Sequence, residues 1–236
     1  MKLTENTIFI TGGGTGIGRG LAEALHKLGN KVIISGRRKE HLDTTTKANP
    51  RMHSVELDIA DPALNVLINN AGIMLIDDAA GKIDEQLLTS TITTNLLGPI
   101  RLTSALIEHL KKQPRATIIY NTSALAFVPL ALTAVYSATK AALHSYVLSQ
   151  RHKLKATSVS VLEIAPPWVQ TDLLNSGKEP RAVPLKDFIE GTVKLLGTET
   201  NEILVEQAKA FRNNPGPNES ALVTQFNDTM IATAPR

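Results

Sequence analysis

Short apolar segments that alternate with helical patterns constrain the fold of this chain most strongly. The apolar segments are near-continuous runs rather than alternations of apolar and polar residues, which is typical of strands buried on both faces. Strands are expected at Thr7–Thr11, Val32–Ser35, Val55–Asp58, Val66–Ile68, Ala116–Asn121, Ser158–Ile164 and Glu202–Val205. Helices are expected at Gly16–Leu28, Gln86–Gln113, Tyr136–Lys155 and Asp187–Leu196. This order predicts an α/β fold of right-handed βαβ units, with helices on both faces of a doubly wound parallel sheet.

Length and composition narrow the class further. A chain of 236 residues fits one α/β domain, so residues 1–236 are expected to form a single domain. The formal net charge of +3 is too small a bias to indicate nucleic acid or an anionic membrane as a partner. The lack of cysteine excludes disulfides, thiolate metal sites and a cysteine nucleophile, and no metal site is expected. No segment approaches the roughly 20 apolar residues of a membrane helix, so the sequence predicts a cytoplasmic protein with no membrane partner.

A glycine-rich turn joins the first expected strand to the first expected helix. From Thr11 to Gly18 its glycines include the spacing G-x-x-x-G-x-G. Glycines let the backbone turn tightly and approach a ligand, and a helix N-terminus offers N–H groups to a phosphate. Glycine clusters also occur in plain turns, but the place of this one between a strand and an amphipathic helix favours a dinucleotide pyrophosphate site. The expected contacts here are Gly12, Gly14, Thr15, Gly16, Ile17 and Gly18.

The end of the second expected strand bears on the choice between NADP(H) and NAD(H). In dinucleotide-binding folds an acidic residue at this point bonds the ribose 2′-hydroxyl of NAD, whereas arginine accommodates the 2′-phosphate of NADP. This chain has Gly36 at the acidic position, between Ser35 and Arg37. Because guanidinium pairs with phosphate through two parallel hydrogen bonds, NADP(H) is expected in preference to NAD(H), with Ser35 and Arg37 as contacts. The alternative is that Arg37 and Arg38 are solvated loop charges.

A tyrosine and a lysine four residues apart open the second long helix. Residues at i and i+4 share a helix face, so Tyr136 and Lys140 are expected to point the same way. A tyrosine has a pKa near 10, and a fixed ammonium beside it favours the phenolate and lowers that pKa. The pair is therefore a candidate general acid and base.

These motifs, with several others, resemble those of the short-chain dehydrogenase/reductase family. Thr11–Gly18 is similar to the family's TGxxxGxG, and the Asn-Asn-Ala-Gly at 69–72 is similar to its NNAG. Ser123 precedes Tyr136 by the usual family spacing, and Asn95 matches the asparagine of the long central helix. The matches run in family order across nearly the whole chain.

The resemblance extends to the C-terminal part. The segment Pro166–Thr171 is similar to the family's proline–glycine segment under the nicotinamide, with Pro167 where the family has glycine. The stretch Glu202–Asn227 resembles the DltE-like branch of bacterial oxidoreductases. The resemblance implies a Rossmann-like sheet with strand order 3-2-1-4-5-6-7. It also implies an NADP-dependent oxidoreductase that interconverts a carbonyl and an alcohol by hydride transfer.

The resemblance implies a role for each matching residue. Tyr136 exchanges a proton with the carbonyl oxygen, Ser123 polarises the carbonyl, and Lys140 holds the nicotinamide ribose. Asn95 holds a water that links Lys140 to solvent. Family members dimerise through the two long helices, so a homodimer or homotetramer is expected, and nearby apolar side chains suggest an apolar or mixed carbonyl substrate. Further cofactor contacts are implied for Asp58, Ile59, Asn70, Ala71, Gly72, Tyr136, Lys140, Pro166, Val169 and Thr171.

Each role has a structural alternative. Ser123 can cap the turn after a strand, Asn95 can satisfy backbone groups in a helix bend, and Thr171 can cap a helix. Asp58 can begin a turn with Asp61 and Pro62. For the whole protein the alternatives are a non-catalytic NADP-binding sensor or scaffold on the same fold, and a sugar-nucleotide epimerase or dehydratase, which the length and glycine spacing disfavour.

The connection between the third and fourth expected strands is unusually short. Ala60–Asn65 is all that separates Ile59 from Val66, whereas a parallel crossover takes about a dozen residues or more. Two explanations are open. Residues that belong near Pro62–Ala63 are absent, which we favour and which predicts a break in the chain there, or the protein lacks a helix that its relatives carry.

Overall fold

The strands form one parallel sheet at the centre of the molecule. The computed structural model describes residues 1–54, 63–214 and 216–232. Its seven strands lie in the order β3-β2-β1-β4-β5-β6-β7, as expected, and all neighbours are parallel. The strands are β1 (Thr7–Thr11), β2 (Lys31–Ser35), β3 (His53–Ser54), β4 (Leu64–Asn69), β5 (Ala116–Asn121), β6 (Val159–Ile164) and β7 (Glu202–Ile203).

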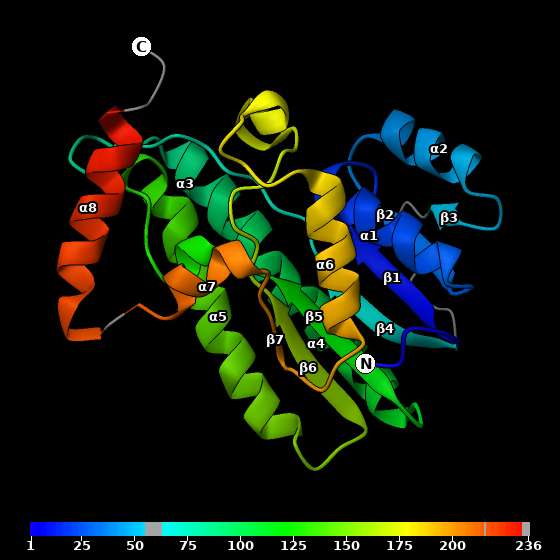
Figure 1. Ribbon diagram of the computed structural model, residues 1–236. Coiled ribbons are helices and arrows are strands. Elements are labelled where there is room, and N and C mark those ends of the chain that lie inside the picture. The colour runs from blue at the N-terminus through cyan, green and yellow to red at the C-terminus, as the bar shows by residue number, and fades with distance from the viewer. Residues whose placement is uncertain (55–62, 215, 233–236) are drawn as a thin grey trace.

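Helices cover both faces of this sheet (Figure 1). One face carries α1, α2 and α6, and the other carries α4 and α5. The helices are α1 (Gly16–Lys27), α2 (Lys39–Ala48), α3 (Glu85–Ile92), α4 (Gly98–Lys112), α5 (Ala134–Leu154), α6 (Leu185–Leu196), α7 (Glu206–Arg212) and α8 (Glu219–Ala232). None of the helices in the described ranges is both long enough and apolar enough to cross a membrane.

The two apolar cores follow from the alternation of side chains along β1. Ile8 and Ile10 face α1 and α6, while Phe9 between them faces α4 and α5. Since successive side chains of a strand point to opposite faces, a strand covered on both sides is apolar throughout. The near-continuous apolar runs of the sequence are thus explained by the two layers of helices.

The structure differs from the expected elements in several places. The expected helix over Gln86–Gln113 is divided into α3 and α4 by a π-helical turn at Thr93–Leu97. The last strand ends at Ile203, because Val205 already precedes α7. Helices α2, α7 and α8 were not expected. The third strand is described only at His53–Ser54. The expected Val55–Asp58, Ile59 and the first half of the short connection lie outside the described residues.

Candidate active site

The candidate site lies at the carboxyl ends of β1, β4, β5 and β6. In a parallel sheet these ends meet at one edge, and ligands of doubly wound folds bind there. The glycine-rich turn follows β1, the segment 69–72 ends β4, Ser123 follows β5 and Pro166 follows β6. The fold therefore brings together motifs that are far apart in the sequence.

The glycine-rich turn needs its glycines for steric reasons. Gly12 and Gly16 have positive φ angles of 68° and 51°, which side chains disfavour. A Cβ on Gly18 would lie 2.2 Å from the carbonyl oxygen of Gly12, and a Cβ on Gly13 would lie 2.5 Å from Cγ2 of Ile34. The chain here passes too close to itself for any side chain. Gly13 was missed by the sequence analysis, which chose Gly14 beside the spaced glycines.

The segment after β4 holds this turn in place. The Thr11 hydroxyl oxygen accepts hydrogen bonds from the backbone N–H groups of Asn70 and Ala71, each at 3.0 Å. Asn70 Nδ2 donates to the carbonyl of Thr11 at 3.0 Å, and Asn121 Nδ2 donates to Asn70 Oδ1 at 2.9 Å. The predicted contacts Asn70 and Ala71 therefore lie directly against the glycine-rich turn.

The arginines after β2 differ in their contacts. Both Arg37 and Arg38 are exposed, and Arg38 Nη2 donates to the hydroxyl of Thr15 at 3.3 Å. Ser35 accepts a hydrogen bond through its carbonyl from the N–H of Gly13 at 3.1 Å. Arg38 thus reaches the glycine-rich turn, although the sequence analysis chose its neighbour Arg37. The cationic dipeptide was the signal, and only side-chain direction distinguishes its two members.

Tyr136 lies with Ser123 at the start of α5. The two side chains lie close enough to interact, and Tyr136 is only 7% exposed. Burial raises the pKa of Tyr136 to about 12, and the interaction with Ser123 opposes that rise. The expected lowering of this pKa by Lys140 is not seen. Burial determines the direction of the shift, and the ammonium nitrogen of Lys140 lies 5.5 Å from the centre of the tyrosine ring.

Lys140 is a buried cation beside this tyrosine. It is 4% exposed, and its Nζ donates to the backbone carbonyl of Asn121 at 2.8 Å. Burial lowers the pKa of Lys140 to about 8, and the negative charge of Glu163 partly opposes this effect. The ammonium is thus directed toward the end of β5, next to Ser123.

Asn95 lies in the π-helical turn between α3 and α4. It is fully buried; its Oδ1 accepts from the N–H of Ile73 at 2.9 Å and its Nδ2 donates to the carbonyl of Ile73 at 2.8 Å. These two bonds match the structural alternative given for Asn95, in which its side chain satisfies backbone groups. The same side chain also lies close to Lys140, because a Cβ on Gly72 would lie 3.4 Å from Asn95 Oδ1 and 3.6 Å from Lys140 Nζ. Such π-helical turns are often found at functional sites.

The remaining predicted contacts are placed as follows. The carbonyl of Pro166 accepts from the N–H of Ala124 at 2.8 Å, which ties the segment after β6 to the segment after β5. Val169 is buried. Thr171 Oγ1 accepts from the N–H of Leu173 at 3.2 Å, which is the capping alternative, yet Thr171 also lies beside Gly16. Asp58 and Ile59 lie outside the described residues.

Asp77 is a site residue that the sequence analysis missed. Its carboxylate oxygens accept from the N–H groups of Ala134 and Val135, at 3.2 and 2.9 Å. These are the first amides of α5, the helix that carries Tyr136 in its first turn. A cap supplied by a residue so distant in sequence has no local signal, so only the structure reveals it.

The sheet and the site define a dinucleotide-binding α/β protein, and the comparisons with known proteins name its family. The family model described as short chain dehydrogenase matches residues 6–182, so this chain belongs to that family of oxidoreductases. It is 38% identical to the uncharacterised oxidoreductase DltE of Bacillus subtilis (strain 168), over 96% of this chain and 98% of the relative. It is 29% identical to the uncharacterised oxidoreductase SERP2049 of Staphylococcus epidermidis, over 73% of this chain and 81% of the relative.

Solved structures agree with this assignment. A short chain dehydrogenase from Burkholderia cenocepacia J2315 in complex with NADP has a TM-score of 0.83 and 25% identity, covering 95% of this chain and 98% of its own. A short chain dehydrogenase/reductase from Burkholderia phymatum in complex with NAD has the same fold, with a TM-score of 0.80, 18% identity and coverage of 94% and 96%. The neighbours therefore include complexes with both nicotinamide cofactors.

The alignment with the Bacillus subtilis relative also bears on the length of this chain. It extends over 248 positions, more than the 236 residues of the chain itself. The relative therefore has residues inside the matched region that this chain lacks. The short connection before β4 is where the sequence analysis expects such a shortening, and Pro62, on one side of the predicted break, lies outside the described residues.

Proposed function

We propose that this protein is an NADP(H)-dependent oxidoreductase that interconverts a carbonyl and an alcohol by hydride transfer. The observation that carries the proposal is the placement of Ser123, Tyr136 and Lys140 at the same sheet edge as the glycine-rich turn. A nucleotide site alone does not make an oxidoreductase, and a tyrosine–lysine pair alone does not bind a cofactor. Their combination supports the reaction class.

The residues present fit a dinucleotide. At Gly12, Gly13 and Gly18 the turn leaves no room for a Cβ, so its backbone is bare at the start of α1. A helix N-terminus behind such a turn suits a pyrophosphate. The segment 70–72 and Lys140 would lie toward the nicotinamide end, with Thr171 beside Gly16. When bound, the cofactor supplies or accepts the hydride, and the chain supplies orientation and protons.

Tyr136 is suited to donate a proton. Because its pKa is raised to about 12, the phenol is protonated at neutral pH. The hydroxyls of Tyr136 and Ser123 would both bond the carbonyl oxygen, and Tyr136 would protonate it as the alcohol forms. The Lys140 ammonium nearby would stabilise the phenolate left behind.

The preference for NADP(H) rests on the two arginines after β2. Arg38 already contacts Thr15 of the glycine-rich turn, and Arg37 is exposed beside it. Two cations and no acid at this point favour a 2′-phosphate over a free 2′-hydroxyl.

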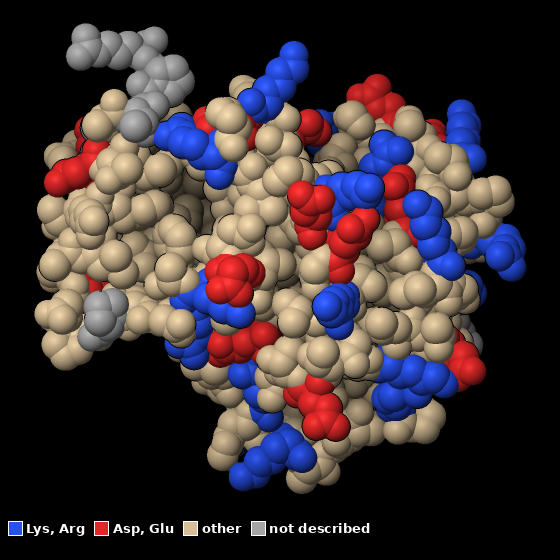
Figure 2. Space-filling view, in the orientation of Figure 1, with Lys and Arg blue, Asp and Glu red and all other residues tan. Residues whose placement is uncertain are grey.

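The substrate proposed is an apolar or mixed carbonyl compound. Figure 2 shows a hollow between α8 and the segment Leu173–Lys178, with mostly uncharged residues around it. Leu173 and Leu174 on that segment are each 40% exposed. A rim of this composition suits an apolar group better than a charged one.

We also propose a homodimer or homotetramer, in which copies meet through α4 and α5. Leu148 on α5 is 43% exposed and would be covered in such an interface. Light scattering at micromolar concentration tests this proposal, and a monomer would contradict it.

The experiment that tests the proposed function is a calorimetric titration with NADPH and, separately, with NADH, followed by turnover on a panel of aldehydes and ketones. Tight NADPH binding, weak NADH binding and reduction of a carbonyl are expected. Binding of NADPH without turnover of any carbonyl would favour the sensor or scaffold alternative. Binding of neither cofactor would contradict the proposal.

A further inference from the structure

A buried carboxylate lies behind the candidate catalytic residues. Glu163 is on β6, which pairs with β5 on one side and β7 on the other, and it is 1% exposed. Burying a charge is costly unless it is paired and hydrogen-bonded. None of the roles proposed above uses this residue, so its presence in the middle of the sheet calls for an explanation.

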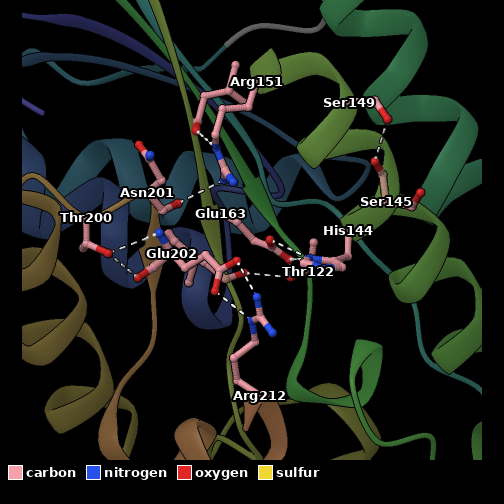
Figure 3. Close-up of polar contacts among 12 residues, drawn as sticks. Thr122, His144, Ser145, Ser149, Arg151, Glu163, Thr200, Asn201, Glu202 and Arg212 are labelled. Atoms are coloured by element: carbon pink, nitrogen blue, oxygen red, sulfur yellow. Dashed lines mark hydrogen bonds and ion pairs between the residues drawn. The ribbon is translucent and has the colours of Figure 1, made fainter. Parts of the chain in front are cut away.

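Two side chains hold Glu163 (Figure 3). His144 Nδ1 lies 2.8 Å from Oε2 and 3.0 Å from Oε1, and the hydroxyl of Thr122 lies 2.6 Å from Oε1. A carboxylate only accepts hydrogen bonds, so Thr122 donates and His144 carries its hydrogen on Nδ1. Both partners therefore direct a donor at the carboxylate.

Both partners are neighbours of the candidate catalytic residues. Thr122 stands between Asn121, whose carbonyl accepts from Lys140 Nζ at 2.8 Å, and Ser123. His144 follows Lys140 by four residues and therefore lies on the same side of α5. Glu163 thus joins the end of β5 to the turn of α5 that follows Lys140.

The charge of Glu163 also reaches Lys140. Burial disfavours the ammonium, and Glu163 is the acid in the described part of the chain whose charge opposes this effect. Tyr136 also faces Lys140, and it is neutral at pH 7.

Other charges surround Glu163 and His144. Arg212, on α7, lies close enough to Glu163 to interact electrostatically, but its guanidinium is bonded to Glu202 at 2.8 and 3.1 Å. Glu202 in turn interacts with His144 and Arg151. Of these neighbours, Arg212 lies on α7, Glu202 on β7 and Arg151 on α5.

We propose that Glu163, held by His144 and Thr122, is a positioning residue that keeps Lys140 charged and fixes the segment Asn121–Ser123. The role in turnover rests on the proposed hydride-transfer function. The effect of Glu163 on the charge of Lys140 does not rest on that function, because this charge is a property of the protein without cofactor or substrate.

The test is a pH titration of Lys140 in the full-length protein. Nitrogen and carbon NMR of the lysine side chains monitors this titration. The Lys140→Arg variant identifies the NMR signal of Lys140, because that signal is the one missing from its spectrum. In Glu163→Gln the midpoint of the titration is expected to fall by about one pH unit. Glu163→Asp keeps the charge, so its midpoint is expected to stay near that of the wild type. A Glu163→Gln protein that is folded by circular dichroism and has an unchanged Lys140 titration would overturn the proposal.

Glu202→Gln is the matched control. It removes a carboxylate from the neighbouring strand β7 that is bonded to Arg212 and not to the candidate site. Its Lys140 titration is expected to match that of the wild type, and an equal fall would show that any nearby acid has the same effect.

A double variant covers the case in which Glu163→Gln does not fold. Glu163→Met with His144→Leu replaces the whole pair by apolar residues of similar size, a change that buried ion pairs often tolerate. The same fall in the Lys140 midpoint is expected, and an unchanged midpoint would again contradict the proposal.

Turnover gives a second readout, which a merely structural role would not produce. Glu163→Gln is expected to lower kcat more than it raises KM, and to shift the pH profile with the Lys140 titration. Glu163→Asp is expected to restore most of kcat. Failure of the wild type to reduce any carbonyl would contradict the proposed function, while the Lys140 titration would still decide the role of Glu163.

Discussion

The two halves of the candidate site are built in different ways. Around the turn between β1 and α1 the structure depends on missing side chains, since a Cβ on Gly18 would lie 2.2 Å from the carbonyl oxygen of Gly12. Between β5, α5 and β6 it depends on side chains that are present and buried, above all Lys140 and Glu163. Substitutions in the first half should act by steric conflict. Those in the second half should act through charge and proton position, with the fold retained.

The largest expected effect is in the catalytic half. Tyr136→Phe removes the hydroxyl that we propose as the proton donor, and kcat is expected to fall by about 10²–10⁴. The Kd for NADPH, measured by calorimetry, is expected to change little, because the ring remains. A variant that retained most of its turnover would remove Tyr136 from the mechanism.

In the glycine half, Gly18→Ala is expected to weaken both the fold and cofactor binding. The added methyl group meets backbone, which cannot move aside as a flexible side chain does, so a loss of about 1–3 kcal/mol in the free energy of unfolding is expected. Urea denaturation measures this loss. Gly177→Ala is the control, because the nearest atom to its Cβ would be 3.8 Å away and its φ is not positive. Equal losses in the two variants would contradict the steric explanation.

The buried lysine predicts how stability depends on pH. Its pKa is about 8 in the folded protein against 10.5 in the unfolded chain, so the unfolded chain binds more protons between these values. Stability therefore rises as pH increases from 8 toward 10, with a contribution from Lys140 of up to about 2 kcal/mol. Above pH 10 the raised pKa of Tyr136 acts in the opposite direction.

The measurement is urea denaturation at pH 8 and pH 10 of the wild type and of Lys140→Met. The variant is expected to lose this rise. If the free energy of unfolding rose equally in the two proteins between pH 8 and pH 10, the rise would come from groups other than Lys140.

The two arginines after β2 allow a finer distinction within the nucleotide half. Arg38→Ala is expected to weaken NADPH binding by about tenfold and NADH binding much less, because one charged contact with phosphate is lost. Arg37→Ala tests the residue that the sequence analysis chose. A larger loss of NADPH affinity in Arg37→Ala than in Arg38→Ala would favour that first choice and assign Arg38 to the support of Thr15.

The smallest expected effect is at the start of α5. Asp77→Ala removes the acceptor for the N–H groups of Ala134 and Val135, and a cap of this kind contributes about 1 kcal/mol. The free energy of unfolding should fall by that amount, with a modest loss of kcat because Tyr136 follows closely. Asp78→Ala is the control, since Asp78 Oδ1 accepts from Ala80 in its own turn. An equal loss in the free energy of unfolding in Asp78→Ala would show that the cap from Asp77 does not stabilise the start of α5.

Local patterns in the sequence were enough for the doubly wound parallel sheet and for most residues of the glycine-rich turn, while the strand order came from the family resemblance. Strands covered on both faces are apolar throughout. A Cβ on Gly18 would lie 2.2 Å from the carbonyl oxygen of Gly12, so this position of the turn requires glycine. Both constraints leave a signal in consecutive residues of the sequence. The expected Tyr136–Lys140 face of α5 is likewise a consequence of helix periodicity. The family follows from the same motifs and is confirmed by the match over residues 6–182.

Tertiary structure alone decided the contacts between distant segments. The π-helical turn at Asn95, the cap from Asp77, the choice of Arg38 at Thr15 and the pairing of Glu163 with His144 all join elements that are far apart in the chain. The rise in the pKa of Tyr136 belongs to the same group, because desolvation depends on everything packed around a side chain. A pattern of neighbouring residues records the direction of a side chain along its own helix or strand, but not which atoms it meets when the sheet and its helices come together.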